Sequence, residues 1–225
     1  MKHRRHEIPR YSKKIKIGDL TLHISNNVYE PAEDTFLIAK NLKAEGLVLD
    51  MGTGCGILSI LAACKAKHVI AVDINPYAAK CAKLNVEINE VSSKVDIIVG
   101  DLFTPLIERP IFDTILFNAP YLPTEDSEPK GPIEYAWSGG RGGREVIDSF
   151  IRQAPKYLKV GGKILIVQSS LSNVEKTIRE FSKQGFQVRI IDRQNLFFET
   201  IILIEAFKDM LSEDISVSNR KEKFA

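Results

Sequence analysis

Residues 48–58 (Val-Leu-Asp-Met-Gly-Thr-Gly-Cys-Gly-Ile-Leu) constrain the fold of this chain more than any other stretch. An apolar run ends in an acid, three glycines alternate with other residues, and an apolar helical pattern follows. This order predicts a buried strand, a tight turn that lets the backbone approach a bound molecule, and a helix whose first N–H groups are free. Asp73 ends the next apolar run, at the distance where nucleoside-binding α/β units place a ribose-binding carboxylate. The pattern therefore predicts an α/β protein that binds a nucleoside cofactor.

Length and composition suit one domain with a sizeable core. The chain has 225 residues, 44% of them hydrophobic, and a net charge of only +2, which gives no argument for nucleic-acid binding. No apolar run reaches the roughly 18 residues of a membrane span, and the basic start lacks the apolar stretch of a secretory signal. The cysteines Cys55, Cys64 and Cys81 have no metal-ligand spacing. We expect reduced thiols in a cytoplasmic protein, with no metal site.

Three segments are expected along the chain. Residues 1–27 form a basic N-terminal segment, which is either a frayed terminus or an arm for RNA or a ribosome-associated substrate. Residues 28–207 form the folded domain, and residues 208–225 form a polar tail that we expect to be disordered. No second domain and no internal repeat are expected.

Inside the folded domain, apolar strand-like runs alternate with helical patterns, which predicts a parallel sheet covered on both faces. The strand-like runs are Leu47–Asp50, Val69–Ile74, Val95–Gly100, Thr114–Asn118 and Lys163–Gln168, and the helical patterns are Thr35–Leu42, Ile57–Ala66, Pro76–Asn89 and Glu145–Leu158. The last two strands, Phe186–Asp192 and Glu199–Ala206, are joined by a turn around residues 193–195 that permits only an antiparallel pair. Five parallel strands and a final hairpin predict the Rossmann-like, seven-stranded sheet of class I methyltransferases.

The spacing of the glycines separates two kinds of cofactor. A dinucleotide-binding turn reads G-x-G-x-x-G, because its helix N-terminus faces a pyrophosphate. Here Gly52, Gly54 and Gly56 alternate strictly. S-adenosyl-L-methionine ends in an ammonium and a carboxylate instead of a phosphate, so this turn and the antiparallel end of the sheet favour it over NAD.

Acids follow three successive strands of the predicted sheet. We expect Asp50 near the cofactor's ammonium, turn N–H groups near its carboxylate, and Asp73 at the ribose hydroxyls. Asp101 and Leu102 would bound the adenine, where the carboxylate accepts from the exocyclic amine and a backbone N–H meets a ring nitrogen. Any one acid alone also reads as a helix cap or turn residue. Together they predict a cofactor site at the carboxyl ends of the strands.

The fourth predicted strand is followed by Asn118-Ala119-Pro120-Tyr121. With Tyr29–Thr35, the glycine turn, Asp73–Asn75, Gly100–Leu102 and Ser138–Glu145, this motif resembles the HemK/PrmC group of protein-glutamine N5-methyltransferases over about residues 28–207. The resemblance implies methyl transfer from S-adenosylmethionine to a glutamine side-chain amide. Because the chain has no room for the N-terminal helical domain of bacterial members, it resembles the short archaeal and eukaryotic branch.

The resemblance also implies a substrate, a partner and site residues. In that branch the glutamine belongs to the Gly-Gly-Gln tip of class-1 translation release factors, and a small zinc-binding activator subunit forms a heterodimer with the enzyme. The implied catalytic residues are Asn118, Ala119, Pro120 and Tyr121, and the implied cofactor-binding residues are Thr35, Asp50, Gly52, Gly54, Gly56, Asp73, Asn75, Asp101, Leu102 and Asn118.

The chemistry of an amide nitrogen explains the motif. Because its lone pair is delocalised into the carbonyl, two acceptors are needed to hold its N–H groups and aim the nitrogen at a methyl group. We expect the Asn118 side-chain oxygen and the carbonyl of residue 119 to be these acceptors, and the Tyr121 ring to offer an apolar face to the planar group. Ala119 stands where the group usually has proline. The alanine keeps the backbone carbonyl but makes the turn less rigid than proline would.

Two other functions remain open from the sequence. A nucleic-acid amino-methyltransferase would act on a similar planar nitrogen with a related motif, but it usually adds a recognition domain or a broad basic face. This chain has only its basic N-terminal segment. A non-catalytic scaffold with a cofactor fold is disfavoured by the intact set of Asp50, Asp73, Asp101 and Asn118.

The third predicted strand, Val95–Val99, is expected at one edge of the sheet, in the strand order 3-2-1-4-5-7-6. Only Asp96 in this strand discourages pairing with another chain. Either Lys94 and the flanking helices protect this edge, or the activator subunit adds a strand to it.

Overall fold

A hairpin and a mixed sheet contain the strands of the computed structural model, which describes residues 13–124 and 131–209. The strands are β1 (Lys13–Ile17), β2 (Leu20–Ile24), β3 (Leu47–Met51), β4 (His68–Asp73), β5 (Val95–Val99), β6 (Phe112–Asn118), β7 (Leu158–Ser169), β8 (Phe186–Asn195) and β9 (Thr200–Lys208). The α-helices are α1 (Glu33–Asn41), α2 (Ile57–Ala63), α3 (Pro76–Ile88), α4 (Glu145–Gln153) and α5 (Val174–Lys183). Short 3₁₀ helices are η1 (Pro132–Ala136), η2 (Arg141–Gly143), η3 (Ala154–Lys156) and η4 (Ser170–Ser172).

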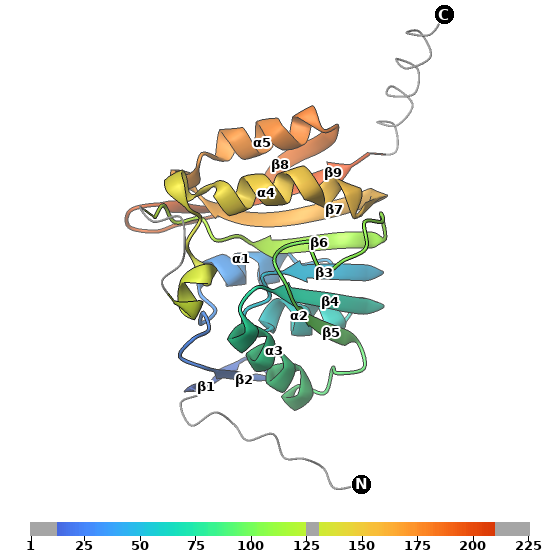
Figure 1. Ribbon diagram of the computed structural model, residues 1–225, viewed down its shortest axis with the longest axis vertical. Helices are drawn as coiled ribbons and strands as arrows, with labels where there is room; N and C mark the ends of the chain where they lie inside the picture. Colours follow the sequence, from blue (N-terminus) through green and yellow to red (C-terminus); the bar gives the residue numbers. More distant parts are fainter. Residues whose placement is uncertain (1–12, 125–130, 210–225) are drawn as a thin grey trace, which may run out of the picture.

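The seven-stranded sheet has the order β5-β4-β3-β6-β7-β9-β8 (Figure 1). Neighbours from β5 to β7 pair in parallel, and β9 pairs antiparallel with both β7 and β8. This confirms the class I methyltransferase sheet predicted from the sequence, with β5 at one edge. Because β3, β4, β5 and β6 are parallel, the residues that follow them meet at one end of the sheet.

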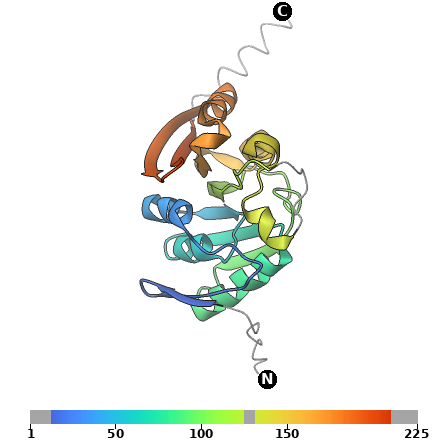
Figure 2. The same cartoon turned by 90° about the vertical axis from the view of Figure 1, so that its left-hand side faces the viewer.

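Helices cover both faces of this sheet (Figures 1 and 2). Side chains of α1, α2 and α3 pack in one apolar cluster with Val48 and Val69, and those of α4 and α5 pack in a second with Leu49 and Phe117. Each fully buried side chain of this size stabilises the fold by about 1.5–3 kcal/mol. Among the described residues, no helix has the length and apolar character needed to cross a membrane.

The β1–β2 hairpin corrects the expected boundary of the folded domain at residue 28. Leu22 and Ile24 are buried in the cluster that α1, α2 and α3 share. Two asparagines of α3 complete the backbone hydrogen bonds of β2: Asn85 bonds the N–H and C=O of His23, and Asn89 those of Thr21, over 2.7–3.1 Å. The expected basic segment therefore contributes residues 13–24 to the fold, and its first 12 residues lie outside the described ranges.

The C-terminal elements differ in extent from those expected. The β8 strand continues to Asn195, so the turn lies at residues 196–199 rather than 193–195. The helix α5 connects β7 to β8 and was not predicted from the sequence, and α4 ends at Gln153 because Pro155 follows it. The expected polar tail begins beside the end of β9 at Lys208, and residues 210–225 of it lie outside the described ranges.

Candidate active site

A cavity of about 280 Å³ opens at the carboxyl ends of β3, β4 and β6. Most residues predicted to bind the cofactor or substrate line it: Thr35, Gly52, Gly54, Asp73, Asn75, Asp101, Leu102, Asn118 and Pro120. Four others are not in the lining: Asp50, Gly56, Ala119 and Tyr121. The cavity is therefore built from the predicted strand ends. The other four predicted residues lie close to these strand ends in the sequence but do not line the cavity.

The glycine turn forms one wall of the cavity. Gly54 has a φ of +58°, and a side chain built there would meet no atom within 4 Å, so its missing side chain leaves room for a ligand. Gly56, with a φ of +87°, instead serves packing, because an added Cβ would lie 3.0 Å from the Cβ of Ala82 on α3. The prediction that Gly56 touches the cofactor is thus replaced by a role in the contact between α2 and α3.

The turn's N–H groups are already engaged by the protein. Gly52 and Thr53 donate to the Val72 carbonyl, Gly54 donates to Asp73 Oδ2 at 2.8 Å, and Gly56 donates to the Thr53 carbonyl. Four of the five N–H groups in residues 52–56 therefore hold the turn to β4 and to itself. The expectation that these groups bind the cofactor's carboxylate is corrected for those four.

Asp50 lies beneath the turn rather than on the cavity surface. Its Oδ2 accepts hydrogen bonds from Thr53 Oγ1 at 2.7 Å and Ser59 Oγ at 2.5 Å, whereas its Oδ1 is buried without a partner among the described residues. Burial raises the pKa of Asp50 to about 6, against the lowering effect of the Ser59 and Thr53 hydrogen bonds. Its first role is to fasten the turn to α2.

The buried charge of Asp50 predicts an unusual pH dependence of stability. A carboxyl whose pKa is raised to about 6 in the folded state costs about 3 kcal/mol of folding free energy above that pH. The stability contributed by the neutral form is present below pH 4 and lost as the pH rises through 6. We therefore expect Asp50→Asn to raise the free energy of unfolding of the cofactor-free protein by about 1–3 kcal/mol at pH 7.5 and by much less at pH 5. Urea unfolding measures both values; a variant that is less stable at both pH values would contradict this account.

Asp73 and the start of the next loop face the cavity from β4 and β5. The Asp73 carboxylate accepts from the N–H groups of Gly54 and Asn75, each at 2.8 Å, and burial is the main reason that its pKa is raised. Each oxygen keeps a further lone pair for a ligand hydroxyl. Asp101 is exposed at the cavity, and Leu102 adopts a left-handed φ of +45° that is strained for a leucine. Both residues line the cavity, and their contact with the adenine stays a prediction.

Asn75 has a positioning role that its motif did not predict. Its Oδ1 accepts from the Tyr77 N–H and caps α3, and its Nδ2 donates to the carbonyls of Asn27 and Pro132. The side chain thereby ties two distant segments to the wall of the cavity. Both N–H groups of this amide are used inside the protein, whereas Oδ1 keeps a second lone pair, so the predicted contact of Asn75 with the cofactor stays a prediction.

A chain of hydrogen bonds fixes the orientation of Asn118. Asn118 Nδ2 donates to Thr35 Oγ1 at 3.1 Å, and Thr35 Oγ1 donates to Asp34 Oδ1 at 3.1 Å. Because the amide nitrogen is held from this side, Asn118 Oδ1 is turned away from Thr35, and it is buried without a partner among the described residues. A buried acceptor without a donor is costly, so this oxygen is suited to receive an N–H from a ligand.

Asp34 also binds two tyrosines, and sequence reasoning gave neither Asp34 nor Tyr29 a role. The hydroxyls of Tyr29 and Tyr121 donate to Asp34 Oδ2 at 3.1 and 3.3 Å. Burial, and then the charge of Asp34, raises the pKa of both tyrosines, so both stay protonated at neutral pH. The only sequence signal for Asp34 was its place before Thr35. An acid in that place is equally typical of the start of an ordinary helix.

The residues present fit S-adenosylmethionine. The cavity offers open space at Gly54, carboxylates at Asp73 and Asp101, and apolar walls that include Val72 and Leu102. Asp73 would hold the ribose and the Asp101–Leu102 loop would bound the adenine, and Asn118 lines the same cavity. When bound, the cofactor supplies an electrophilic methyl group.

Comparisons with known proteins agree with this site. The family model of the ribosomal protein L11 methyltransferase (PrmA) matches residues 35–119. A putative protein N5-glutamine methyltransferase of Methanocaldococcus jannaschii is 43% identical over 198 residues, which cover 86% of this chain and 98% of that protein. The methyltransferase HEMK2 of Homo sapiens is 34% identical over 175 residues, or 72% of this chain and 81% of the human protein. The structure of the E. cuniculi Mtq2–Trm112 complex is similar with a TM-score of 0.61 and 25% identity, over 81% of this chain and 99% of that one.

The fold and the cavity define a class I methyltransferase that uses S-adenosyl-L-methionine. The extent and identity of the matches show that the chain belongs to the HemK-like family of protein-glutamine N5-methyltransferases.

Proposed function

We propose that this enzyme methylates the N5 atom of a glutamine side chain, and that the glutamine lies in the Gly-Gly-Gln motif of a class-1 translation release factor. The observation that carries the proposal is the buried Oδ1 of Asn118, which has no partner in the part of the chain that the structure describes. It is held at the wall of the cofactor cavity through Thr35 and Asp34. An acceptor in this position favours a substrate group that carries an N–H donor, such as an amide. A carboxylate or a thioether has no N–H donor and would leave the acceptor unpaired.

The side chains then act by position rather than by strong base catalysis. Asn118 Oδ1 would accept one N–H of the substrate amide, and the carbonyl of Ala119 would accept the other. Held this way, the nitrogen presents its lone pair to the methyl group, and both acceptors stabilise the positive charge that develops on it. Tyr121 reaches Asp34 through its hydroxyl, so its ring is fixed beside this position rather than free to move.

The names of the relatives support the substrate. A release factor glutamine methyltransferase of Geobacter sulfurreducens is 32% identical over 175 residues, or 72% of this chain and 60% of that protein. The Mtq2–Trm112 complex is described as responsible for the methylation of the eRF1 translation termination factor. We therefore place the reaction in the cytoplasm, where release factors work.

A side-by-side transfer assay tests this proposal. The purified enzyme, with labelled S-adenosylmethionine, is offered a class-1 release factor, the same factor with its Gly-Gly-Gln glutamine changed to alanine, transfer RNA and duplex DNA. We expect label on the native release factor alone. Label on either nucleic acid with none on the release factor would favour the amino-methyltransferase alternative.

The Mtq2–Trm112 complex supports a small partner subunit for this enzyme, and we also propose that such a subunit adds a strand to β5. The β5 strand pairs only with β4 among the described strands, and Val99 is 54% exposed. The Lys94 carbonyl and the Gly100 N–H both bond to β4, so the even-numbered residues face β4 and the N–H groups of Val95, Ile97 and Val99 point outward. These outward groups are free to pair with a partner's backbone.

Val99→Pro is expected to weaken activator binding by about tenfold or more, because it removes one outward donor and blocks close approach of a second strand. The ladder to β4 does not use this N–H, so the fold should be retained. Val99→Ala is the matched control and should bind normally. Ile97 is a poorer choice, because its side chain packs against the core. Calorimetry with the activator measures both variants, and equal affinities would argue against strand addition at this edge.

A further inference from the structure

The loop between β8 and β9 carries the two most exposed large apolar side chains of the described residues. Phe197 is 93% exposed and Phe198 is 86% exposed, and their rings meet edge to face with centroids 4.7 Å apart. The loop is closed by the Leu196 N–H, which donates to the Glu199 carbonyl at 2.8 Å, and by Thr200 Oγ1, which donates to Asn195 Oδ1 at 3.1 Å. The two rings are thus presented on a preformed turn rather than on a loose segment.

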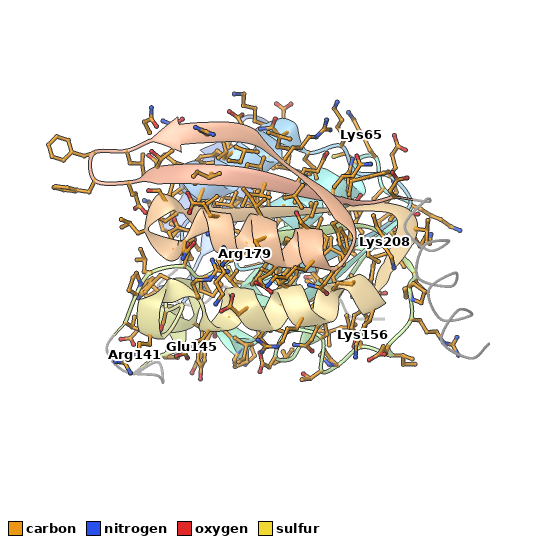
Figure 3. All side chains as sticks on the ribbon, turned by 90° about the horizontal axis from the view of Figure 1, so that it is seen from above. Lys65, Arg141, Glu145, Lys156, Arg179 and Lys208 are labelled. Atoms are coloured by element: carbon orange, nitrogen blue, oxygen red, sulfur yellow. The ribbon has the colours of Figure 1, made fainter. Side chains whose placement is uncertain are left out.

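Strand register places this turn at the same end of the sheet as the active site. Asn118 is in register with Val167 of β7, and Val167 is in register with Leu203 of β9. Since β9 begins at Thr200, the turn starts about 10 Å beyond the level of Asn118, at the end of the sheet where the cavity opens. Figure 3 shows the turn extending past the body of the protein at the same end as Arg141 and Glu145, far from Lys156 and Lys208. Glu145 lines the cavity.

The base of the turn is set into the protein. Glu199 Oε2 is buried without a hydrogen-bond partner among the described residues. Leu171, which is 58% exposed, lies in η4 next to the start of β9, where Ser170 Oγ accepts from the Thr200 N–H. The exposed apolar side chains of this region therefore include Leu171 as well as the two phenylalanines of the turn.

The composition of the turn favours a protein over a nucleic acid as its contact. Residues 194–200 contain no lysine or arginine, and the one basic residue next to them is the exposed Arg193. A single base is fewer than the several phosphate contacts that supply most nucleic-acid affinity. Asp192, just before the turn, is paired with Lys40, so that lysine is not free for a phosphate. Exposed aromatic side chains at a reactive opening are typical anchors for an apolar groove on a protein partner.

We propose that Phe197 and Phe198 dock the folded body of the substrate protein, in an apolar groove beside its glutamine loop, while the glutamine itself enters the cavity at Asn118. This inference rests on the proposed function, because it takes a folded protein as the substrate. It adds a recognition surface outside the cavity, at the opposite edge of the sheet from β5, so an activator bound at β5 would leave it open.

The test compares an intact release factor with a short peptide that contains Gly-Gly-Gln. In the double variant Phe197→Ser/Phe198→Ser, we expect kcat/KM for the intact protein to fall by about tenfold or more, chiefly through KM, while kcat/KM for the peptide is unchanged. Ile107→Ser is the matched control: Ile107 is 77% exposed, beside Glu108, which pairs with Lys156 at the other end of the sheet. It should leave both substrates unaffected.

Binding of the release factor, measured by interferometry on immobilised enzyme, separates this inference from the proposed function. Binding that depends on the two phenylalanines supports the docking surface even if no methyl group is transferred. Equal losses on protein and peptide, or no loss on either, would overturn the inference while leaving the proposed reaction intact. A native dimer that the double variant converts to monomers in sedimentation would assign the turn to self-association and also overturn it.

Discussion

Asn118→Ala is expected to lower kcat for methyl transfer by about 10²–10³-fold while changing the affinity for S-adenosylmethionine little. The Asn118 oxygen is the one acceptor at the cavity wall that is buried and unpartnered among the described residues, so its hydrogen bond is made only with a substrate and strengthens as charge develops on the nitrogen. Removing one preorganised group of this kind costs other enzymes about 2.7–4 kcal/mol of transition-state stabilisation. Single-turnover kinetics with calorimetric cofactor binding measures both quantities.

Variants of Thr35 test whether the orientation of Asn118 matters as well as its presence. Thr35→Val keeps the shape but removes the hydroxyl that accepts from Asn118 Nδ2, so the amide is free to turn, and we expect kcat to fall by about tenfold. Thr35→Ser restores the hydroxyl and should restore most of the rate. Full activity in Asn118→Ala would reject the positioning role, and full activity in Thr35→Val would show that Asn118 is oriented without Thr35.

Asp73→Ala is expected to weaken S-adenosylmethionine binding by about 10²-fold or more. Two hydrogen bonds from ribose hydroxyls to a carboxylate are worth about 1.5–3 kcal/mol each. The same carboxylate also holds the N–H groups of Gly54 and Asn75, so its loss loosens the turn that forms the cavity wall. Calorimetric titration of the cofactor gives the affinity directly.

Asp96→Ala is the matched control for Asp73→Ala. Asp96 is an exposed acid on the neighbouring strand β5, paired with His68 and outside the cavity, so its removal should leave cofactor binding unchanged. Circular dichroism and urea unfolding would establish that both variants are folded. If a folded Asp73→Ala protein bound S-adenosylmethionine with native affinity, Asp73 would not be the residue that binds the ribose.

The sequence was sufficient to predict the sheet and the end of it that carries the site. Apolar runs of strand length, the glycine turn and the acids after successive strands all follow from local patterns. It placed both Asp50 and Asp73 in contact with the cofactor, because both are acids at the ends of predicted buried strands. What distinguishes them is that Asp50 bonds to Ser59, inside the following helix, whereas Asp73 faces the cavity.

Features that depend on distant contacts could not be predicted in the same way. The lysines in β1 suggested a solvated arm. The structure instead holds this hairpin through Asn85 and Asn89, which are more than 60 residues away in the sequence. Residues 193–195 suggested a turn, yet β8 lies at the edge of the sheet, where polar side chains reach solvent without ending the strand. The role of Asp34 likewise appears only when Tyr29 and Tyr121 are brought to it by the fold.

The atom that receives the methyl group distinguishes amide methylation from every other reaction of this fold. A release factor methylated by this enzyme is digested, the labelled peptide is sequenced by tandem mass spectrometry, and the isolated peptide is hydrolysed in acid. We predict one methyl group on the glutamine of Gly-Gly-Gln and release of the label as methylamine, which only a methylated amide nitrogen yields. Label on another residue, or its release as methanol from a methyl ester, would contradict the proposal that this enzyme methylates the glutamine of a release factor.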